Sequence, residues 1–132
     1  MKHGIATTLA PPPLPQFSQG VRKGSLLQTA GQVGTDPATG QSAGEDVETQ
    51  TRQALHNVNA IIEAGGGTFD DVISLRVYLK NEADFATMNA AYDAFVPAHT
   101  PSGVLPARTT VVVGFAAPWI LVEIDALAVL AD

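Results

Sequence analysis

Two carboxylates interrupt an apolar run near the end of the chain. Side chains of a β-strand point alternately to its two faces, so Glu123 and Asp125 would share one face. The opposite face would carry Ile120, Val122, Ile124, Ala126 and Ala128. On one interpretation the acidic face is simply solvated. On the other, one carboxylate is partly buried and transfers protons or activates water.

Arg108 lies just before the preceding β-rich run, in the segment Pro106-Ala107-Arg108-Thr109-Thr110. Its guanidinium presents a rigid fork that matches a carboxylate, which a small acidic substrate would offer. The alternative is a structural ion pair, at the surface, at an interface or with Glu123 on a paired strand. Residue type and spacing leave these alternatives open.

The other reactive residues indicate no further catalytic class. His3, His56 and His99 are scattered and the chain has no cysteine, so we predict no metal site. Gly-x-Ser-x-Gly and phosphate-binding glycine loops do not occur either. We expect Phe17 and Trp119 to be packing residues rather than ligand platforms.

Length and charge narrow the protein classes further. The 132 residues suit one domain, 1–132, with an ordinary globular composition. A net charge of -6 repels phosphate backbones, so we expect no nucleic-acid partner. No apolar run approaches the length of a membrane helix or a signal peptide, so we predict a cytoplasmic protein without a membrane partner.

The first third of the chain predicts an arm followed by a hairpin. Pro11, Pro12, Pro13 and Pro15 favour an extended, proline-rich arm over residues 1–16. Between residues 17 and 33, two strand-like pieces flank the turn-prone segment 23–25. Residues 35–40 are typical of a loop.

The rest of the chain alternates between helix and strand periods. Apolar residues at three- and four-residue steps predict a helix over 47–62, with Ser42 and Glu45 as a capping box and three glycines, 65–67, at its end. A strand is expected over 72–79, with Ile73, Leu75, Val77 and Leu79 on its buried face. A second helix would bury Phe85, Met88, Tyr92 and Phe95, and Pro97 would close it. Two β-rich runs follow, over 109–113 and 120–130.

The resulting order, β-β-α-β-α-β-β, predicts an α+β domain with two helices on one face of a mixed sheet. The chain contains no further segment to cover the other sheet face. Oligomerisation through the sheet is therefore the economical solution.

Short segments in this order and spacing resemble the RidA (YjgF) family over nearly the whole chain. They are Pro15-Gln16-Phe17-Ser18-Gln19, Ala30-Gly31-Gln32, Asp36-Pro37-Ala38-Thr39-Gly40, Gln50-Thr51-Arg52-Gln53, Val77-Tyr78-Leu79-Lys80, Asp84-Phe85, Asn89-Ala90-Ala91-Tyr92, Pro106-Ala107-Arg108 and Val122-Glu123-Ile124-Asp125-Ala126. The resemblance implies a chorismate-mutase-like fold and a homotrimer, whose sheets form a central β-barrel with clefts between subunits.

The resemblance also implies a reaction. It is the hydrolytic deamination of carboxylate-bearing enamines and imines, such as 2-iminobutanoate and 2-iminopropanoate, to 2-oxo acids and ammonia. Because an imine is already a strong electrophile, this reaction would require neither a metal nor an organic cofactor. Arg108 would hold the substrate carboxylate and Glu123 would position or activate water. Gly31, Asn89 and Thr110 would line the same cleft, together with Phe17 and Ala30.

Three departures from the family pattern affect the expected substrate. Phe17 and Ala30 stand where the best-known deaminases have a tyrosine and a hydroxyl residue, residues 99–105 are longer than usual, and residues 115–119 are more apolar. A specialised pathway deaminase with a larger substrate therefore remains an alternative. So does a non-catalytic trimer that binds a small carboxylate or a protein.

Overall fold

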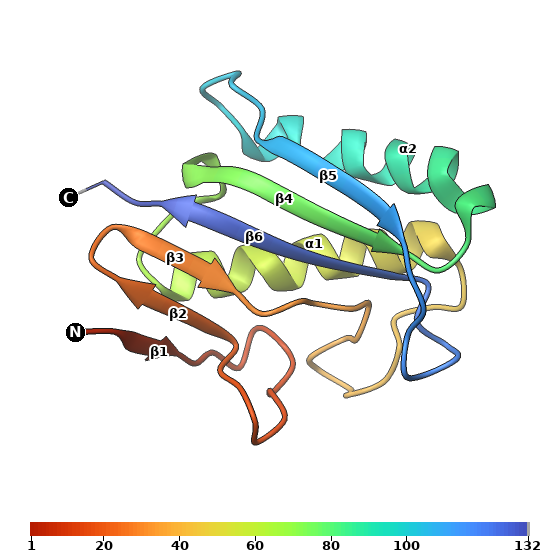
Figure 1. Ribbon diagram of the computed structural model, residues 1–132, viewed down its shortest axis with the longest axis horizontal. Coiled ribbons are helices and arrows are strands. Elements are labelled where there is room, and N and C mark those ends of the chain that lie inside the picture. Colours follow the sequence, from red (N-terminus) through yellow and green to blue (C-terminus); the bar gives the residue numbers. More distant parts are fainter. Residues whose placement is uncertain (132) are drawn as a thin grey trace.

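The computed structural model describes residues 1–131, which form one six-stranded mixed sheet with two helices (Figure 1). The strands are β1 (His3–Ile5), β2 (Gly20–Lys23), β3 (Leu26–Thr29), β4 (Val72–Leu79), β5 (Ala107–Val112) and β6 (Val122–Val129). The helices are α1 (Val47–Ala64) and α2 (Phe85–Phe95). Within residues 1–131, no helix is both long and apolar enough to cross a membrane.

The strand order in the sheet is β1-β2-β3-β6-β4-β5. Only the β4–β5 pair is parallel, and α2 is the crossover that a parallel connection requires. The predicted α+β class, with two helices and a mixed sheet, is confirmed. β1 adds one strand to the predicted order: its three residues pair with β2 through the backbone and carry no hydrophobic alternation to reveal them.

Helix α1 begins at a different cap from the one predicted. Asp46 is the N-cap, and the Thr49 amide donates to its carboxylate at 2.9 Å. The predicted box of Ser42 and Glu45 is wrong, because the Ser42 hydroxyl instead donates to the Gly44 carbonyl at 2.6 Å. The glycine run does end the helix, and Gly66 has the positive φ, 94°, that favours glycine.

Strand β4 has the predicted bounds but not the predicted face for every residue. A register shift between Val72 and Ser74 marks a β-bulge in its pairing with β6. The bulge turns Ile73 outward, where it is 51% exposed, so its predicted place with Leu75 on the buried face is wrong. Alternation elsewhere in β4 holds, since Leu75, Val77 and Leu79 are fully buried.

One sheet face packs on the helices and the other is uncovered. On β6, Val122, Ile124, Ala126 and Ala128 are fully buried against the helices. In Figure 1, α1 lies behind the sheet, and the viewer looks onto the uncovered face. Glu123 and Asp125 therefore belong to the uncovered face, as the alternation predicted.

Candidate active site

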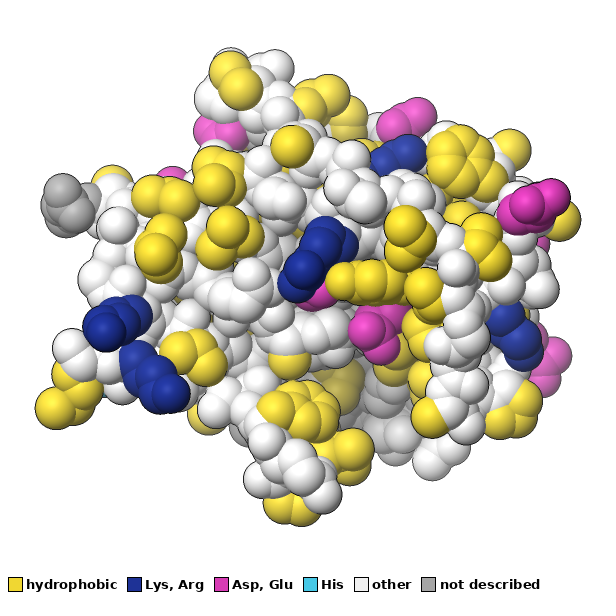
Figure 2. Space-filling view, in the orientation of Figure 1, with side chains coloured by type: hydrophobic (Ala, Val, Ile, Leu, Met, Phe, Trp, Pro, Cys, Tyr) yellow, Lys and Arg dark blue, Asp and Glu magenta, His cyan; other side chains and the backbone are white. Residues whose placement is uncertain are grey.

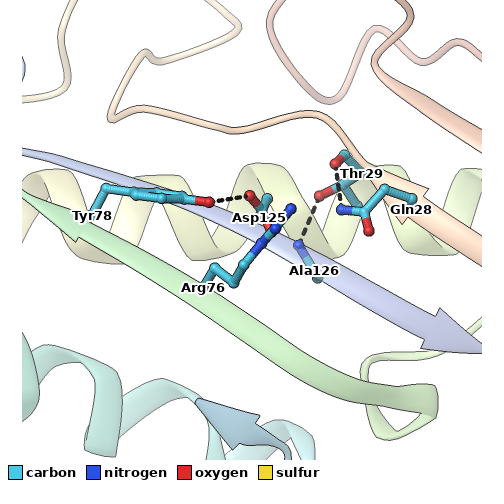
Figure 3. Close-up of polar contacts among 6 residues, drawn as sticks. All are labelled: Gln28, Thr29, Arg76, Tyr78, Asp125 and Ala126. Carbon is cyan, nitrogen blue, oxygen red and sulfur yellow. Dashed lines mark hydrogen bonds and ion pairs between the residues drawn. The ribbon is translucent and has the colours of Figure 1, made fainter. Parts of the chain in front are cut away.

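The two carboxylates of β6 have different surroundings. Asp125 is 7% exposed and accepts from Arg76 Nε at 2.8 Å and from the Tyr78 hydroxyl at 3.1 Å (Figure 3). Arg76 and Tyr78 come from the adjacent strand β4, where they alternate with the buried residues. Figure 2 shows a cationic side chain beside acidic ones near the middle of this face. Asp125 is thus committed to a structural ion pair.

Glu123 is the free carboxylate of this face. It is partly buried and forms no ion pair within residues 1–131. Burial raises the pKa of its carboxyl above the ordinary value, and the charge of Asp125 raises it further. A carboxyl with a raised pKa exchanges protons closer to neutral pH, which suits a general acid or base.

Gly31 lies directly against Glu123 because the segment after β3 rejoins β6. The Gln32 amide donates to the Ile124 carbonyl at 2.8 Å, and the Ile124 amide donates back to the Gln32 carbonyl at 2.9 Å. A Cβ on Gly31 would lie 2.5 Å from Glu123 Oε2 and 2.8 Å from its Cδ. A larger residue at position 31 would therefore displace the Glu123 carboxylate from its observed place.

A pocket of about 540 Å³ adjoins this position. Gly31 and Phe17 both line it, together with Trp119 and the prolines at 11–13. Phe17 and Trp119 are 46% and 40% exposed, so both rings are only partly packed, and whether they serve as packing residues or ligand platforms stays a prediction. Ala30 lies beside Gly31, where its amide donates to the Gln19 carbonyl at 2.8 Å.

Arg108 lies on the opposite side of the sheet from Glu123. It pairs in register with Leu75, whose side chain is buried on the helix-covered face. The guanidinium carbon is 4.7 Å from the ring centre of Tyr92 and 5.8 Å from that of Phe85, both on α2. Phe85 is 43% exposed, so its predicted burial in the core is wrong and it lies beside Arg108 instead.

Two further predicted site residues occupy these same elements. Asn89 belongs to α2, and Thr110 follows Arg108 by two positions on β5. Asn89 Oδ1 and Thr110 Oγ1 are buried, and neither has a hydrogen-bond partner in the described part of the chain. Buried polar atoms of this kind are costly unless they find a hydrogen-bond partner.

The structure therefore separates the predicted site into two halves. β4 lies between β5 and β6. The register and the spacing of strands place the Cα atoms of Arg108 and Glu123 about 14 Å apart, with their side chains on opposite faces of the sheet. The hypothesis that these two residues pair within one chain is wrong. One small substrate cannot contact both residues of the same chain.

Sequence reasoning missed the roles of Arg76 and Tyr78, although their alternation on β4 was visible. What it lacked was the pairing of β4 with β6, which brings both side chains to Asp125. His56 is exposed on α1, and His99 stacks on Phe95 with ring centres 3.8 Å apart. No group of three potential metal ligands occurs among the described residues, and the expected absence of a metal stays a prediction.

Comparison with known proteins identifies a matching family and similar enzymes. Residues 7–130 match the family described as endoribonuclease L-PSP. The 2-iminobutanoate/2-iminopropanoate deaminase of Salmonella typhimurium is 43% identical over 129 residues, which cover 98% of each chain.

Two solved structures extend the similarity to the fold. The YjgF gene product of E. coli is 40% identical, with a TM-score of 0.89 and coverage of 96% of this chain and 98% of that one. E. coli TdcF with bound serine is 36% identical, with a TM-score of 0.90, and the match covers 98% of this chain and 99% of the TdcF chain. The resemblance inferred from the sequence is confirmed, and the chain belongs to the YjgF/RidA family that the endoribonuclease L-PSP description covers.

Proposed function

We propose that this protein hydrolyses reactive imines and enamines of amino acids to 2-oxo acids and ammonia. The observation that carries the proposal is the free, partly desolvated Glu123 carboxylate, whose pKa is raised and which Gly31 leaves accessible. The similarity to a deaminase of 2-iminobutanoate and 2-iminopropanoate over 98% of the chain supports the substrate class.

We propose that the working site forms between subunits of a homotrimer. A cyclic interface joins two different patches, so the Arg108 patch of one chain would meet the Glu123 patch of the next, three times around the ring. This arrangement would cover the open sheet face and form the central β-barrel. Asn89 and Thr110, whose buried side-chain oxygens have no hydrogen-bond partner in the described part of the chain, would lie beside this cleft.

In such a cleft, Arg108 would hold the substrate carboxylate through two parallel hydrogen bonds and orient the imine carbon toward Glu123. Glu123 would accept a proton from water as the water oxygen bonds to that carbon. It would then return the proton to the nitrogen, and the C–N bond would break as the carbonyl forms. Imine and water are consumed, and a 2-oxo acid and ammonia are released.

The remaining predicted contacts come from the first third of the chain. Phe17 and Gly31 line the pocket, and they would lie beside the substrate together with Ala30, the neighbour of Gly31. The side chains of Phe17 and Ala30 offer no hydroxyl group to the substrate. A cytoplasmic location and the absence of a nucleic-acid partner stay predictions, the latter because a net charge of -6 opposes binding to phosphate backbones.

Mixing inactive variants tests both the reaction and the divided site. Imines are generated in situ from an amino acid, and 2-oxo acid release is followed for Arg108→Ala, Glu123→Gln and a refolded equimolar mixture. Each variant alone should be nearly inactive. The mixture should recover about a quarter of wild-type activity, because one cleft in four then receives both native residues. A mixture as inactive as its parents would contradict the divided site.

A second candidate function is binding without catalysis. It is favoured by the serine bound to the similar TdcF, which shows that a relative holds a small carboxylate. In that case the protein would bind 2-oxo acids but would not accelerate imine hydrolysis over buffer. The same assay, run with wild type alone, separates the two functions.

A further inference from the structure

We propose that the pocket beside Gly31 selects imines with a large apolar side chain, and that Trp119 is the specificity-determining residue. This inference rests on the proposed deaminase function, since the pocket would hold the part of the substrate that does not react. It names substrates with larger side chains than the 2-iminobutanoate and 2-iminopropanoate for which the similar Salmonella enzyme is named.

The chemistry of the pocket wall is the first observation. Its apolar surface comes from Pro12, Leu14, Phe17, Ala117, Trp119 and Ile120, and no described lining residue is ionisable. The volume of about 540 Å³ lies within the ~300–1,000 Å³ of pockets that hold drug-sized ligands. A methyl or ethyl side chain would leave most of this space to water, whereas a branched or aromatic one would displace that water.

The second observation is that the chain fixes Trp119 in place. Gln50 is fully buried, and its side-chain amide donates to the Trp119 carbonyl at 3.0 Å while accepting from the Leu121 amide at 2.9 Å. The Lys80 ammonium donates to the Pro118 carbonyl at 2.7 Å. Gln50 of α1 and Lys80, the residue after β4, therefore hold the backbone on both sides of Trp119.

A fixed and partly exposed indole makes a preformed binding surface. Trp119 is 40% exposed although it adjoins the pocket, so its uncovered face is available to a ligand. A ligand side chain that covers the indole removes apolar area from water on both partners, and no loop has to be ordered first. The substrate would place its reacting carbon near Glu123 and its side chain across Gly31 into the pocket.

The activity test compares imines made in situ from alanine, 2-aminobutanoate, leucine and phenylalanine. For wild type, kcat/KM should be at least about tenfold higher for the leucine-derived imine than for the alanine-derived one. Trp119→Ala should lower this ratio about tenfold, and Trp119→Phe should keep most of it. Leu9→Ala is the matched control, because Leu9 is 72% exposed and does not line the pocket. A wild-type ratio near one, or a ratio that Trp119→Ala leaves unchanged, overturns the proposal.

A binding test separates this inference from the deaminase function. Trp119 is the only tryptophan of the chain, so intrinsic fluorescence reports directly on the pocket. Titration with 4-methyl-2-oxopentanoate should change the emission at a concentration at least about tenfold lower than titration with pyruvate. If no imine is accelerated but this preference is seen, the deaminase function fails and the selective pocket stands. Equal titrations for the two acids overturn the selectivity, whatever the activity.

Discussion

Glu123 and Asp125 are two residues apart on the same face of β6, but only one is available for chemistry. Asp125 uses its two oxygens to bind Arg76 and Tyr78, whereas Glu123 forms no ion pair in the described part of the chain. Sequence alternation placed both on one face and could not distinguish them, because the distinction depends on which strand lies alongside.

Glu123→Gln tests the catalytic assignment. The substitution keeps the shape of the side chain but removes the proton acceptor, so kcat should fall by roughly 10²–10⁴ with little loss of thermal stability. Asp125→Asn is the matched control. It should instead lower the free energy of unfolding by about 1–3 kcal/mol, since it weakens a charged hydrogen bond to Arg76. Steady-state kinetics and denaturant titrations measure the two effects, and full kcat in folded Glu123→Gln would refute the catalytic role.

The raised pKa of Glu123 predicts a pH-dependent difference in stability. A carboxyl whose pKa is higher in the folded than in the unfolded state binds its proton more tightly when folded. Its contribution to stability is therefore greatest below the unfolded pKa, about 4.3, and is lost as the pH rises through the raised folded pKa. The amide introduced by Glu123→Gln does not titrate, so the unfolding temperature of the variant relative to wild type should increase over this range. A difference that is flat or that decreases with pH contradicts the raised pKa.

Gly31→Ala tests the close packing beside the carboxylate. The new Cβ would lie 2.5 Å from Glu123 Oε2, so the glutamate side chain must move. We expect kcat to fall by about 10-fold or more, since small displacements of a catalytic group are costly. Gly40→Ala is unsuitable as a control because its φ is 72°, but Gly114→Ala meets no atom within 4 Å and should leave kcat unchanged.

At the scale of elements, the sequence predicted periodic segments well and local irregularities poorly. The bounds of β4 and the buried face of β6 follow from alternation alone. Ile73 departs from it because a bulge inserts one residue, and a bulge depends on the partner strand β6. Phe85 has helical spacing suited to the core but lies at the first residue of α2, where the Arg108 guanidinium contacts its ring instead.

The cap of α1 provides a test at this scale. Asp46→Ala should lower the unfolding temperature, because the substitution leaves the Thr49 amide at the helix start without its acceptor. Ser42→Ala, at the position that the sequence pattern favoured, should lower it less, since the Ser42 hydroxyl bonds to Gly44 in the same loop and not to the helix start. Thermal melts followed by circular dichroism compare the two variants. An equal or larger effect at Ser42 would contradict the observed cap.

At the scale of the whole molecule, the uncovered sheet face predicts assembly. Its exposed apolar side chains include Val111, which is 41% exposed and pairs in register with Tyr78. Wild type should have the mass of three chains by light scattering, and Val111→Asp should dissociate it by placing a charge in the covered face. Leu9→Asp, which changes an apolar residue that is 72% exposed and outside this face, should remain a trimer. A monomeric wild type at micromolar concentration would refute the assembly and the shared cleft.

The sequence could predict the need for a cover over the sheet but not the division of the site. That division follows from strand order, because β4 separates β5 from β6 and alternation then places Arg108 and Glu123 on opposite faces. Residue spacing along the chain carries no information on this order. The two residues are 15 positions apart and resemble an ordinary within-chain pair.

The opposite placement of Arg108 and Glu123 has a genetic consequence. In the proposed ring, every chain supplies its arginine to one cleft and its glutamate to another, so a chain that lacks both would inactivate two clefts at once. An allele that encodes a chain without either residue, expressed beside a normal allele, would therefore remove a larger fraction of the activity than its fraction of the protein. Dominance of this kind, rather than simple loss of dosage, is what a divided site imposes on its gene.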